Sequence, residues 1–139
     1  MRSHPMLVTL LLVGACGGGT YFTTLTAAPS TSPPDVIACA RSKLTQAGYQ
    51  QTSLDPTDNR LTARKIDNSV RHADPQFRRN VNRIEVEAGA GADGKTALTV
   101  VGHTFAEYST QRGPTEVEEK ASEDARQAAQ AVVTSCGQS

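Results

Sequence analysis

VNRIEVEA, residues 81–88, is the stretch of sequence from which the fold can be worked out. Apolar or amide side chains alternate in it with charged ones, so that Ile84 and Val86 fall on one side and Glu85 and Glu87 on the other. Successive side chains of a strand point to opposite faces of a sheet. The alternation therefore predicts a strand with one wet face, which is typical of antiparallel sheets.

Three further segments have strand character and extend this one into a meander. Turn-forming residues separate them, at 55–59 and in the glycine-rich segment 89–94, which ends in Asp-Gly. Residues 67–80 are irregular and contain Asp74-Pro75, so we expect a loop there. Gly102 inside the last strand predicts a bulge or a bend. The four strands expected are 49–54, 60–66, 81–88 and 95–108.

Two helices are expected on either side of these strands. Ser32-Pro33 supplies an N-cap and a first helical position, and Gly48 a C-cap, which predicts a helix over 34–47. Thr115-Glu116-Val117-Glu118 fits a second capping box, and an apolar stripe at three- and four-residue spacing runs on to Cys136. We therefore expect a second helix from about residue 115, ended by Gly137.

This order, helix, four strands, helix, predicts the α+β class. An antiparallel sheet with one wet face needs cover on its other face, and both helices can provide it. The expected domain is a single α+β unit over residues 34–139. Its chain contains no tryptophan and few aromatic residues, so the core must be thin. A thin core in a small domain often needs a covalent staple.

The N-terminal segment has the features of a secretory leader. Arg2 precedes an apolar run, Met6–Val13, and the small residues Gly14 and Ala15 follow. The run is eight residues long, whereas a membrane span needs about twenty. We therefore expect residues 1–15 to be a signal peptide. Removing these 15 of the 139 residues leaves 124, the length of one domain.

Residues 13–16, Val-Gly-Ala-Cys, resemble the lipobox of bacterial lipoproteins. The resemblance implies diacylglycerol on the Cys16 sulfur and cleavage before Cys16. It also implies an envelope location, with Gly17 favouring the periplasmic face of the outer membrane over the inner membrane. The alternative is ordinary secretion with an incidental Cys16. Residues 16–33 would form the lipidated cysteine and a flexible linker, although Thr20–Leu25 is β-prone and could pair with a sheet edge.

With Cys16 assigned to lipid, Cys39 and Cys136 remain as a pair. Exported proteins keep disulfides, so we expect a bond between the start of the first helix and the end of the last one. Antiparallel neighbouring helices would bring these two ends together. Two buried free thiols are the alternative. A metal site is disfavoured because neither cysteine has a second ligand at the usual spacing.

No catalytic motif is present, and we expect no cofactor. After the leader, 13 basic residues face 14 acidic ones, which gives no sign of nucleic-acid binding. The first hypothesis is a membrane-anchored, non-enzymatic accessory or binding module that contacts an envelope protein, a glycan or an anionic headgroup. The alternative is a periplasmic enzyme using His103 or His72. Basic residues in and after the loop could contact an anion, although they could equally be a solvated surface: Arg71, Arg78, Arg79 and Arg83.

Overall fold

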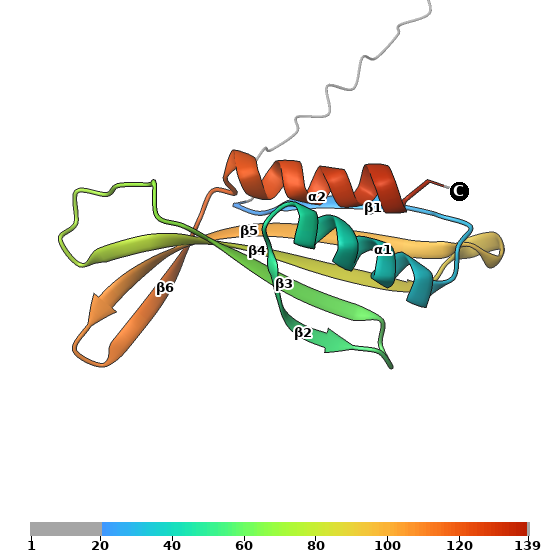
Figure 1. Cartoon of the computed structure of the whole chain (residues 1–139), viewed down its shortest axis with the longest axis horizontal. Helices are drawn as coiled ribbons and strands as arrows, with labels where there is room; N and C mark the ends of the chain where they lie inside the picture. Colours follow the sequence, from blue (N-terminus) through green and yellow to red (C-terminus); the bar gives the residue numbers. More distant parts are fainter. Residues whose placement is uncertain (1–20, 139) are drawn as a thin grey trace, which may run out of the picture.

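Six strands and two α-helices form the described part, residues 21–138, of a computed structural model of the chain (Figure 1). The expected α+β class with an antiparallel sheet and two helices is confirmed. A single 3₁₀ turn, Ala92–Gly94, connects two of the strands. The elements in chain order are β1 Thr23–Ala27, α1 Pro33–Gln46, β2 Gln50–Asp55, β3 Arg60–Asp67, β4 Phe77–Ala90, β5 Thr96–Thr110, β6 Gly113–Glu119 and α2 Glu123–Cys136.

The sheet has six strands where four were expected, and every pairing within residues 21–138 is antiparallel. Strands β2 to β5 form the expected meander. The two additional strands share the outer edge of β5, one after the other. β1 pairs with residues 98–102 of β5, and β6 pairs with residues 104–110. The long strand β5 thus has neighbours along nearly its whole length on both sides.

β1 corrects the expectation of a linker over residues 16–33. Residues 23–27 form a strand of the sheet, as the β-prone character of this segment allowed. Leu25 and Ala27 pack against the hydrophobic core, while Thr24 and Thr26, which alternate with them, are exposed. Before the strand, the Ala121 amide donates a hydrogen bond to the Tyr21 carbonyl oxygen (2.6 Å). The described chain is therefore fixed to the fold from its first residue.

β6 corrects the expected start of the second helix. Residues 113–119 form a strand, and α2 begins at Glu123 with Ser122 as N-cap, whose hydroxyl accepts from the Ala125 amide. Gly113 has a positive φ of 106° and closes a tight turn after β5. Beyond this turn, β6 forms hydrogen bonds with the part of β5 that β1 does not reach, residues 104–110. A helix starting at Thr115 would have left these backbone groups of β5 unpaired.

The expected loop over 67–80 is shorter in the structure. β3 ends at Asp67 and β4 begins at Phe77, so four of those residues belong to β4. Phe77 pairs with Tyr108 and Asn80 with Ala106, which extends the sheet beyond the helices. A β-bulge between Phe77 and Arg79 interrupts the regular pairing. The bulge breaks the alternation that would have marked this end of the strand.

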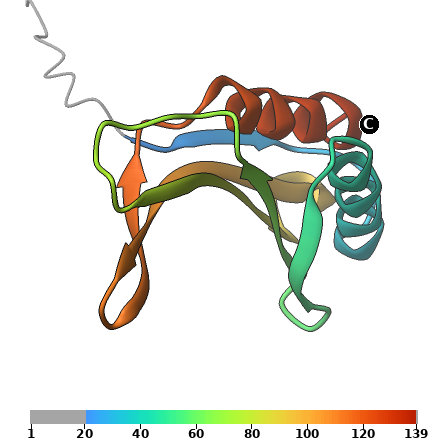
Figure 2. The same ribbon diagram turned by 60° about the vertical axis from the view of Figure 1, so that its left-hand side comes forward.

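Both helices cover one face of the sheet (Figure 1). The sheet bends into an arch whose outer face carries the helices, and the β2–β3 and β5–β6 hairpins hang from its two sides (Figure 2). We call the uncovered inner face the concave face. The core between helices and sheet is aliphatic, and its largest fully buried side chains include Leu44, Leu61, Ile84, Leu98 and Val132.

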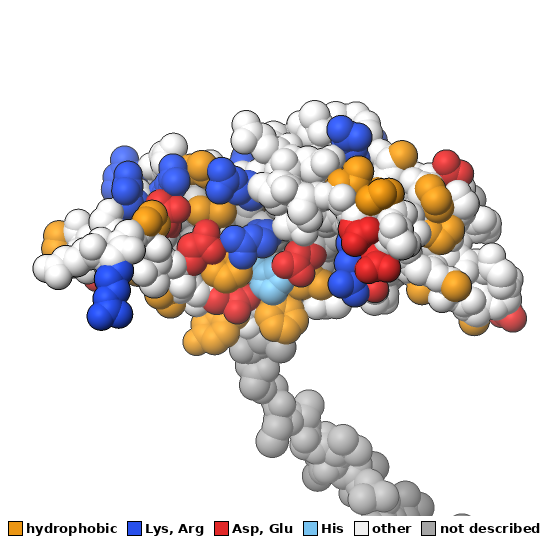
Figure 3. Space-filling model, turned by 90° about the horizontal axis from the view of Figure 1, so that it is seen from below, with side chains coloured by type: hydrophobic (Ala, Val, Ile, Leu, Met, Phe, Trp, Pro, Cys, Tyr) orange, Lys and Arg blue, Asp and Glu red, His pale blue; other side chains and the backbone are white. Residues whose placement is uncertain are grey.

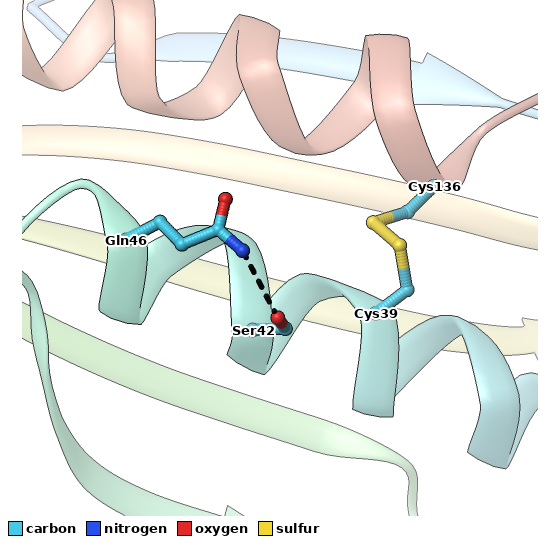
Figure 4. Close-up of a disulfide and its surroundings, with 4 residues drawn as sticks. All are labelled: Cys39, Ser42, Gln46 and Cys136. Carbon is cyan, nitrogen blue, oxygen red and sulfur yellow. Dashed lines mark hydrogen bonds between the residues drawn. A yellow bond between two sulfur atoms is a disulfide. The ribbon is translucent and has the colours of Figure 1, made fainter.

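The expected disulfide between Cys39 and Cys136 is confirmed. It joins the first half of α1 to the last residue of α2, with the two Cα atoms 5.8 Å apart (Figure 4). Cys136 is buried, and Cys39 packs against the core. On the neighbouring turns of α1, the Gln46 side chain donates to the Ser42 hydroxyl (3.4 Å). The disulfide therefore holds the two helices together over the sheet.

Of the two features expected at Gly102, a bulge or a bend, the bulge is absent. The pairing of β5 with β4 and β1 runs through Gly102 without a register shift. A Cβ atom at this position would lie 3.1 Å from the Ala125 carbonyl oxygen in α2 and 3.0 Å from a methyl group of Thr23. The absent side chain thus lets α2 approach the sheet closely.

Candidate interaction surface

The concave face carries most of the charged side chains of the sheet. They come from the strand positions that alternate with core residues, so the same pattern that buries one face exposes the other. Figure 3 shows acidic and basic side chains interspersed on this face around a histidine, with hydrophobic side chains beside it. Its main residues are Arg60, Thr62, Arg64, Arg83, Glu85, Glu87, Thr99, Val101, His103, Phe105, Glu116 and Glu118.

A row of stacked side chains crosses the concave face from β4 to the segment before β1. The Arg83 guanidinium lies 4.5 Å from the centre of the Phe105 ring. Phe105 stacks on His103 with ring centroids 5.8 Å apart, and His103 lies 5.3 Å from Phe22. We call these four residues the stacked row. Cation–π and aromatic contacts of this kind hold each ring in one orientation.

Glutamates of β6 anchor the two basic members of the stacked row. Glu116 pairs with Arg83 (3.0 Å), and the Glu118 carboxylate lies 2.6 Å from Nδ1 of His103. The His103 side chain is 17% exposed, so its ring is reached by water only at its rim. These contacts exist because residues 113–119 form a strand beside β5. The capping-box pattern predicted a helix at Glu116 and Glu118, whereas their every-second-residue spacing is the signal in the sequence that indicates a strand.

The other half of the concave face contains a groove of about 410 Å³. Its charged residues are Arg60, Glu85 and Glu87. Arg60 and Glu87 form an exposed ion pair (3.3 Å), which leaves Glu85 without an ion-pair partner among residues 21–138. The groove therefore favours a basic or hydrogen-bond-donating group. Its lining is Arg60, Leu61, Thr62, Glu85, Val86, Glu87, Thr99 and Val101.

The four arginines expected to contact an anion do not converge on one point. Arg71 turns back onto its own loop and donates to the Asn68 and Val70 carbonyl oxygens. Arg79 pairs with Glu107 (3.1 Å), and Arg83 belongs to the stacked row. Arg78 donates to the Ser109 hydroxyl (3.3 Å). Two of the four thus already have carboxylate partners, so their charges are largely neutralised within the protein.

His72 lies in the loop after β3, on the side of the sheet opposite to His103. Its ring stacks on Phe77, with centroids 4.0 Å apart, and Nε2 lies 3.4 Å from the Glu119 carboxylate. Tyr108 meets both rings edge-on. Neither histidine lines the groove on the concave face or any of three further cavities within residues 21–138. Each imidazole contacts a carboxylate and aromatic rings from neighbouring segments, so each has a structural role in packing these segments together.

A polar cluster beneath the start of α2 was missed by the sequence analysis. Asp124 accepts hydrogen bonds from the Tyr49 hydroxyl (2.7 Å), the Lys65 ammonium (2.8 Å) and the Asn82 amide (3.3 Å). Burial raises the pKa of the Tyr49 hydroxyl, and the hydrogen bond to Asp124 raises it further. The cluster joins β3, β4, α2 and the segment between α1 and β2, which are far apart in sequence, so no local pattern could have indicated it.

The Asn82 side chain extends this cluster into the sheet. Its carbonyl oxygen accepts from the Thr104 hydroxyl (2.7 Å) and from the Ser122 hydroxyl (2.9 Å). The Thr104 hydroxyl in turn accepts from the Ser122 amide (2.8 Å). Buried polar groups that all find partners fix one arrangement of the surrounding elements. These contacts explain where α2 begins.

No arrangement of three or more potential metal ligands occurs within residues 21–138. No helix in this same part of the chain has the length and apolar character to cross a membrane. Cys16 and the leader lie outside the described residues. Comparisons with protein-family models and with curated proteins find no match for this chain.

Proposed function

We propose that this protein is a membrane-anchored envelope lipoprotein whose folded domain is a non-enzymatic binding module. The observation that supports the lipid anchor is the disulfide between Cys39 and Cys136. It accounts for two of the three cysteines and leaves Cys16, the last residue of the lipobox-like segment, for acylation. Two or three acyl chains bind a protein stably to a bilayer, at about 0.8 kcal/mol per buried methylene. Gly17 favours the outer membrane.

The anchor can be tested in the full chain. Expression in a bacterial host with labelled palmitate should label the wild-type protein and the Cys39→Ser/Cys136→Ser variant, but not Cys16→Ser. Mass spectrometry of the N-terminal peptide should find diacylglycerol on Cys16 and no residue before it. An unlabelled wild type, or a mature N-terminus elsewhere, would show that Cys16 is not the attachment site.

The groove on the concave face supports the binding role. It is open and polar, and it contains a carboxylate, Glu85, that a basic group of an envelope protein could pair with. The ion pair of Arg60 with Glu87 is exposed, at 60% and 55% of the two side chains, and such pairs contribute at most about 1 kcal/mol. A partner can therefore replace it at little cost.

Site-specific photocrosslinking tests this role. A photoreactive residue at Thr62, inside the groove, should give a discrete adduct in intact cells. The same residue at Ser42, on the exposed side of α1, is the matched control and should give none. Glu85→Lys should remove the Thr62 adduct by reversing the charge. Equal labelling from both positions, or an adduct that survives Glu85→Lys, would rule out the groove as the contact.

The alternative of a periplasmic enzyme receives less support from the described residues. His103 and His72 each contact a carboxylate, which is one part of many catalytic sites. Each ring is, however, also packed between aromatic side chains, and neither lines a described cavity. The binding module explains these contacts without further assumptions.

A further inference from the structure

The described chain begins at an exposed pair of aromatic residues. Tyr21 is 60% exposed and Phe22 is 40% exposed, and they are two of four large hydrophobic side chains that the surface of residues 21–138 leaves open. The others, Leu54 and Val117, stand singly on β2 and β6. Tyrosine is enriched at the boundary between lipid and water, where its ring is in apolar surroundings and its hydroxyl reaches water, and the adjacent Phe22 adds apolar surface.

This pair is held in place by the fold. The Tyr21 carbonyl oxygen accepts from the Ala121 amide (2.6 Å), and Phe22 lies against His103 of the stacked row. From Thr23 onward the chain is paired with β5. The chain therefore leaves the domain from a fixed point, at the junction between β1 and β6 on the outer edge of β5.

The distance from Cys16 to this point is limited by covalent geometry. Tyr21 comes five positions after Cys16, and a fully extended chain of that length spans at most about 18 Å. The 15 residues of β5 span about 50 Å. The linker expected over residues 16–33 would have let the domain stand off the bilayer. With β1 in the sheet, the anchor and the aromatic pair must stay close together.

We infer that Tyr21 and Phe22 lie in the headgroup region of the bilayer that holds the Cys16 lipid; this inference rests on the anchor proposed above. The anchored domain is thereby oriented, with the junction of β1 and β6 toward the membrane and the β2–β3 hairpin farther from it. Phe22 sits at one end of the stacked row, so the groove at the other half of the concave face stays open to the periplasm.

Apolar contact, rather than charge, drives this docking. The side chains around the pair have both signs: Lys120 is exposed, and the neighbouring Glu118 and Glu119 pair with His103 and His72. An attraction that depends on anionic lipids is therefore not expected. Docking should occur on zwitterionic phosphatidylcholine, which makes this lipid the appropriate probe.

The chain contains no tryptophan, so one introduced tryptophan reports its own surroundings. Tyr21→Trp places the reporter at the proposed contact. Leu54→Trp places it on β2 at a side chain that is 39% exposed in the wild type, close to the 40% of Phe22, and is the matched control. The lipid-bearing protein is reconstituted into phosphatidylcholine vesicles with and without brominated acyl chains, whose bromine atoms quench nearby tryptophan.

The fluorescence of Tyr21→Trp should fall about twofold in brominated vesicles, while that of Leu54→Trp should not change. Phe22→Trp repeats the measurement at the adjacent side chain, and circular dichroism checks that each variant is folded. Absence of quenching at both positions 21 and 22 would overturn the inference. Stronger quenching at position 54 would overturn it too, by showing that the opposite edge faces the lipid.

The anchor and the orientation can fail separately in this design. The mass of the purified protein shows whether Cys16 is lipidated. If it is not, the chain from Cys16 onward, which contains every described element, is coupled through the Cys16 thiol to a maleimide headgroup lipid in the same vesicles. Quenching at position 21 would then uphold the orientation with the natural anchor refuted, and its absence would refute both.

Discussion

Removing the Tyr49 hydroxyl should destabilise the protein through a specific contact with α2. Tyr49 is 3% exposed, and its hydroxyl donates to the Asp124 carboxylate at 2.7 Å. Asp124 is the second residue of α2 and also accepts from Lys65 and Asn82. The hydroxyl therefore connects the chain after α1 to the first turn of α2.

The expected size follows from these contacts. A hydrogen bond to a charged group contributes about 1.5–3 kcal/mol, and the other two donors of Asp124 place Tyr49→Phe near the lower end, at about 1–2 kcal/mol. Asp124→Ala should cost more, about 2–4 kcal/mol, because it leaves the buried Tyr49 hydroxyl without its acceptor and removes a negative charge from the helix N-terminus. The Lys65–Asp124 pair adds little, since 34% and 41% of the two side chains is exposed.

A double-mutant cycle isolates the contact. The free energy of unfolding, measured by urea denaturation for the wild type, Tyr49→Phe, Asp124→Ala and the double variant, should show a coupling of about 1–2 kcal/mol. Tyr108→Phe is the control, because Tyr108 meets His72 and Phe77 rather than Asp124. A coupling below about 0.5 kcal/mol would refute the reasoning, since independent sites show no more than that.

The same residue predicts an alkaline dependence of stability. Because the pKa of Tyr49 is raised in the folded protein, mainly by burial, the folded state keeps its proton where the unfolded state loses it. This contribution is complete below the unfolded pKa of about 10 and is lost as the pH rises above it, by at most about 1.4 kcal/mol per pH unit. The gap in stability between wild type and Tyr49→Phe should therefore shrink above pH 10. A difference in the free energy of unfolding that stays constant up to pH 11.5 would contradict this prediction.

Three further changes test the fold. Reducing the bond between Cys39 and Cys136, 97 positions apart, should lower the free energy of unfolding by about 4–5 kcal/mol in the chain-entropy model, measured by urea denaturation with and without reductant. Gly102→Val should cost about 1–3 kcal/mol through overpacking against α2, seen as a lower melting temperature; an unchanged value would mean that α2 can move away freely. Ser122→Ala should cost about 1–2 kcal/mol through loss of the N-cap, whereas Ser42→Ala on exposed α1 should change stability by less than about 0.5 kcal/mol.

Several elements could be predicted from the sequence because each has a local cause. The first helix, expected over 34–47, extends from Pro33 to Gln46, since its capping residues directly flank it and its apolar spacing lies within it. The alternation in 81–88 indicated β4 and its wet face, since a strand's two faces follow from adjacent residues. The disulfide followed from the cysteine count once Cys16 was assigned to lipid.

Where a segment fits two local structures, contacts with distant parts of the chain selected one of them. Residues 115–118 fit a capping box and also alternate as a strand should, and residues 20–25 fit both a spacer and a strand. The unpaired backbone of β5 selected the strands Thr23–Ala27 and Gly113–Glu119, because buried amide and carbonyl groups must find partners. The sequences of these two segments do not show that β5 has an open edge, nor how long that edge is.

The sequence by itself therefore determined the class of the fold, the covalent link between its helices and the wet face of its central strand. Only the tertiary structure decided the six-stranded sheet, the stacked row from Arg83 to Phe22 and the entry of Thr23–Ala27 into the sheet as β1. The physical reason is that amphipathic periodicity records which side of an element is buried. It does not record which element lies opposite, and that choice depends on backbone pairing between residues distant in sequence.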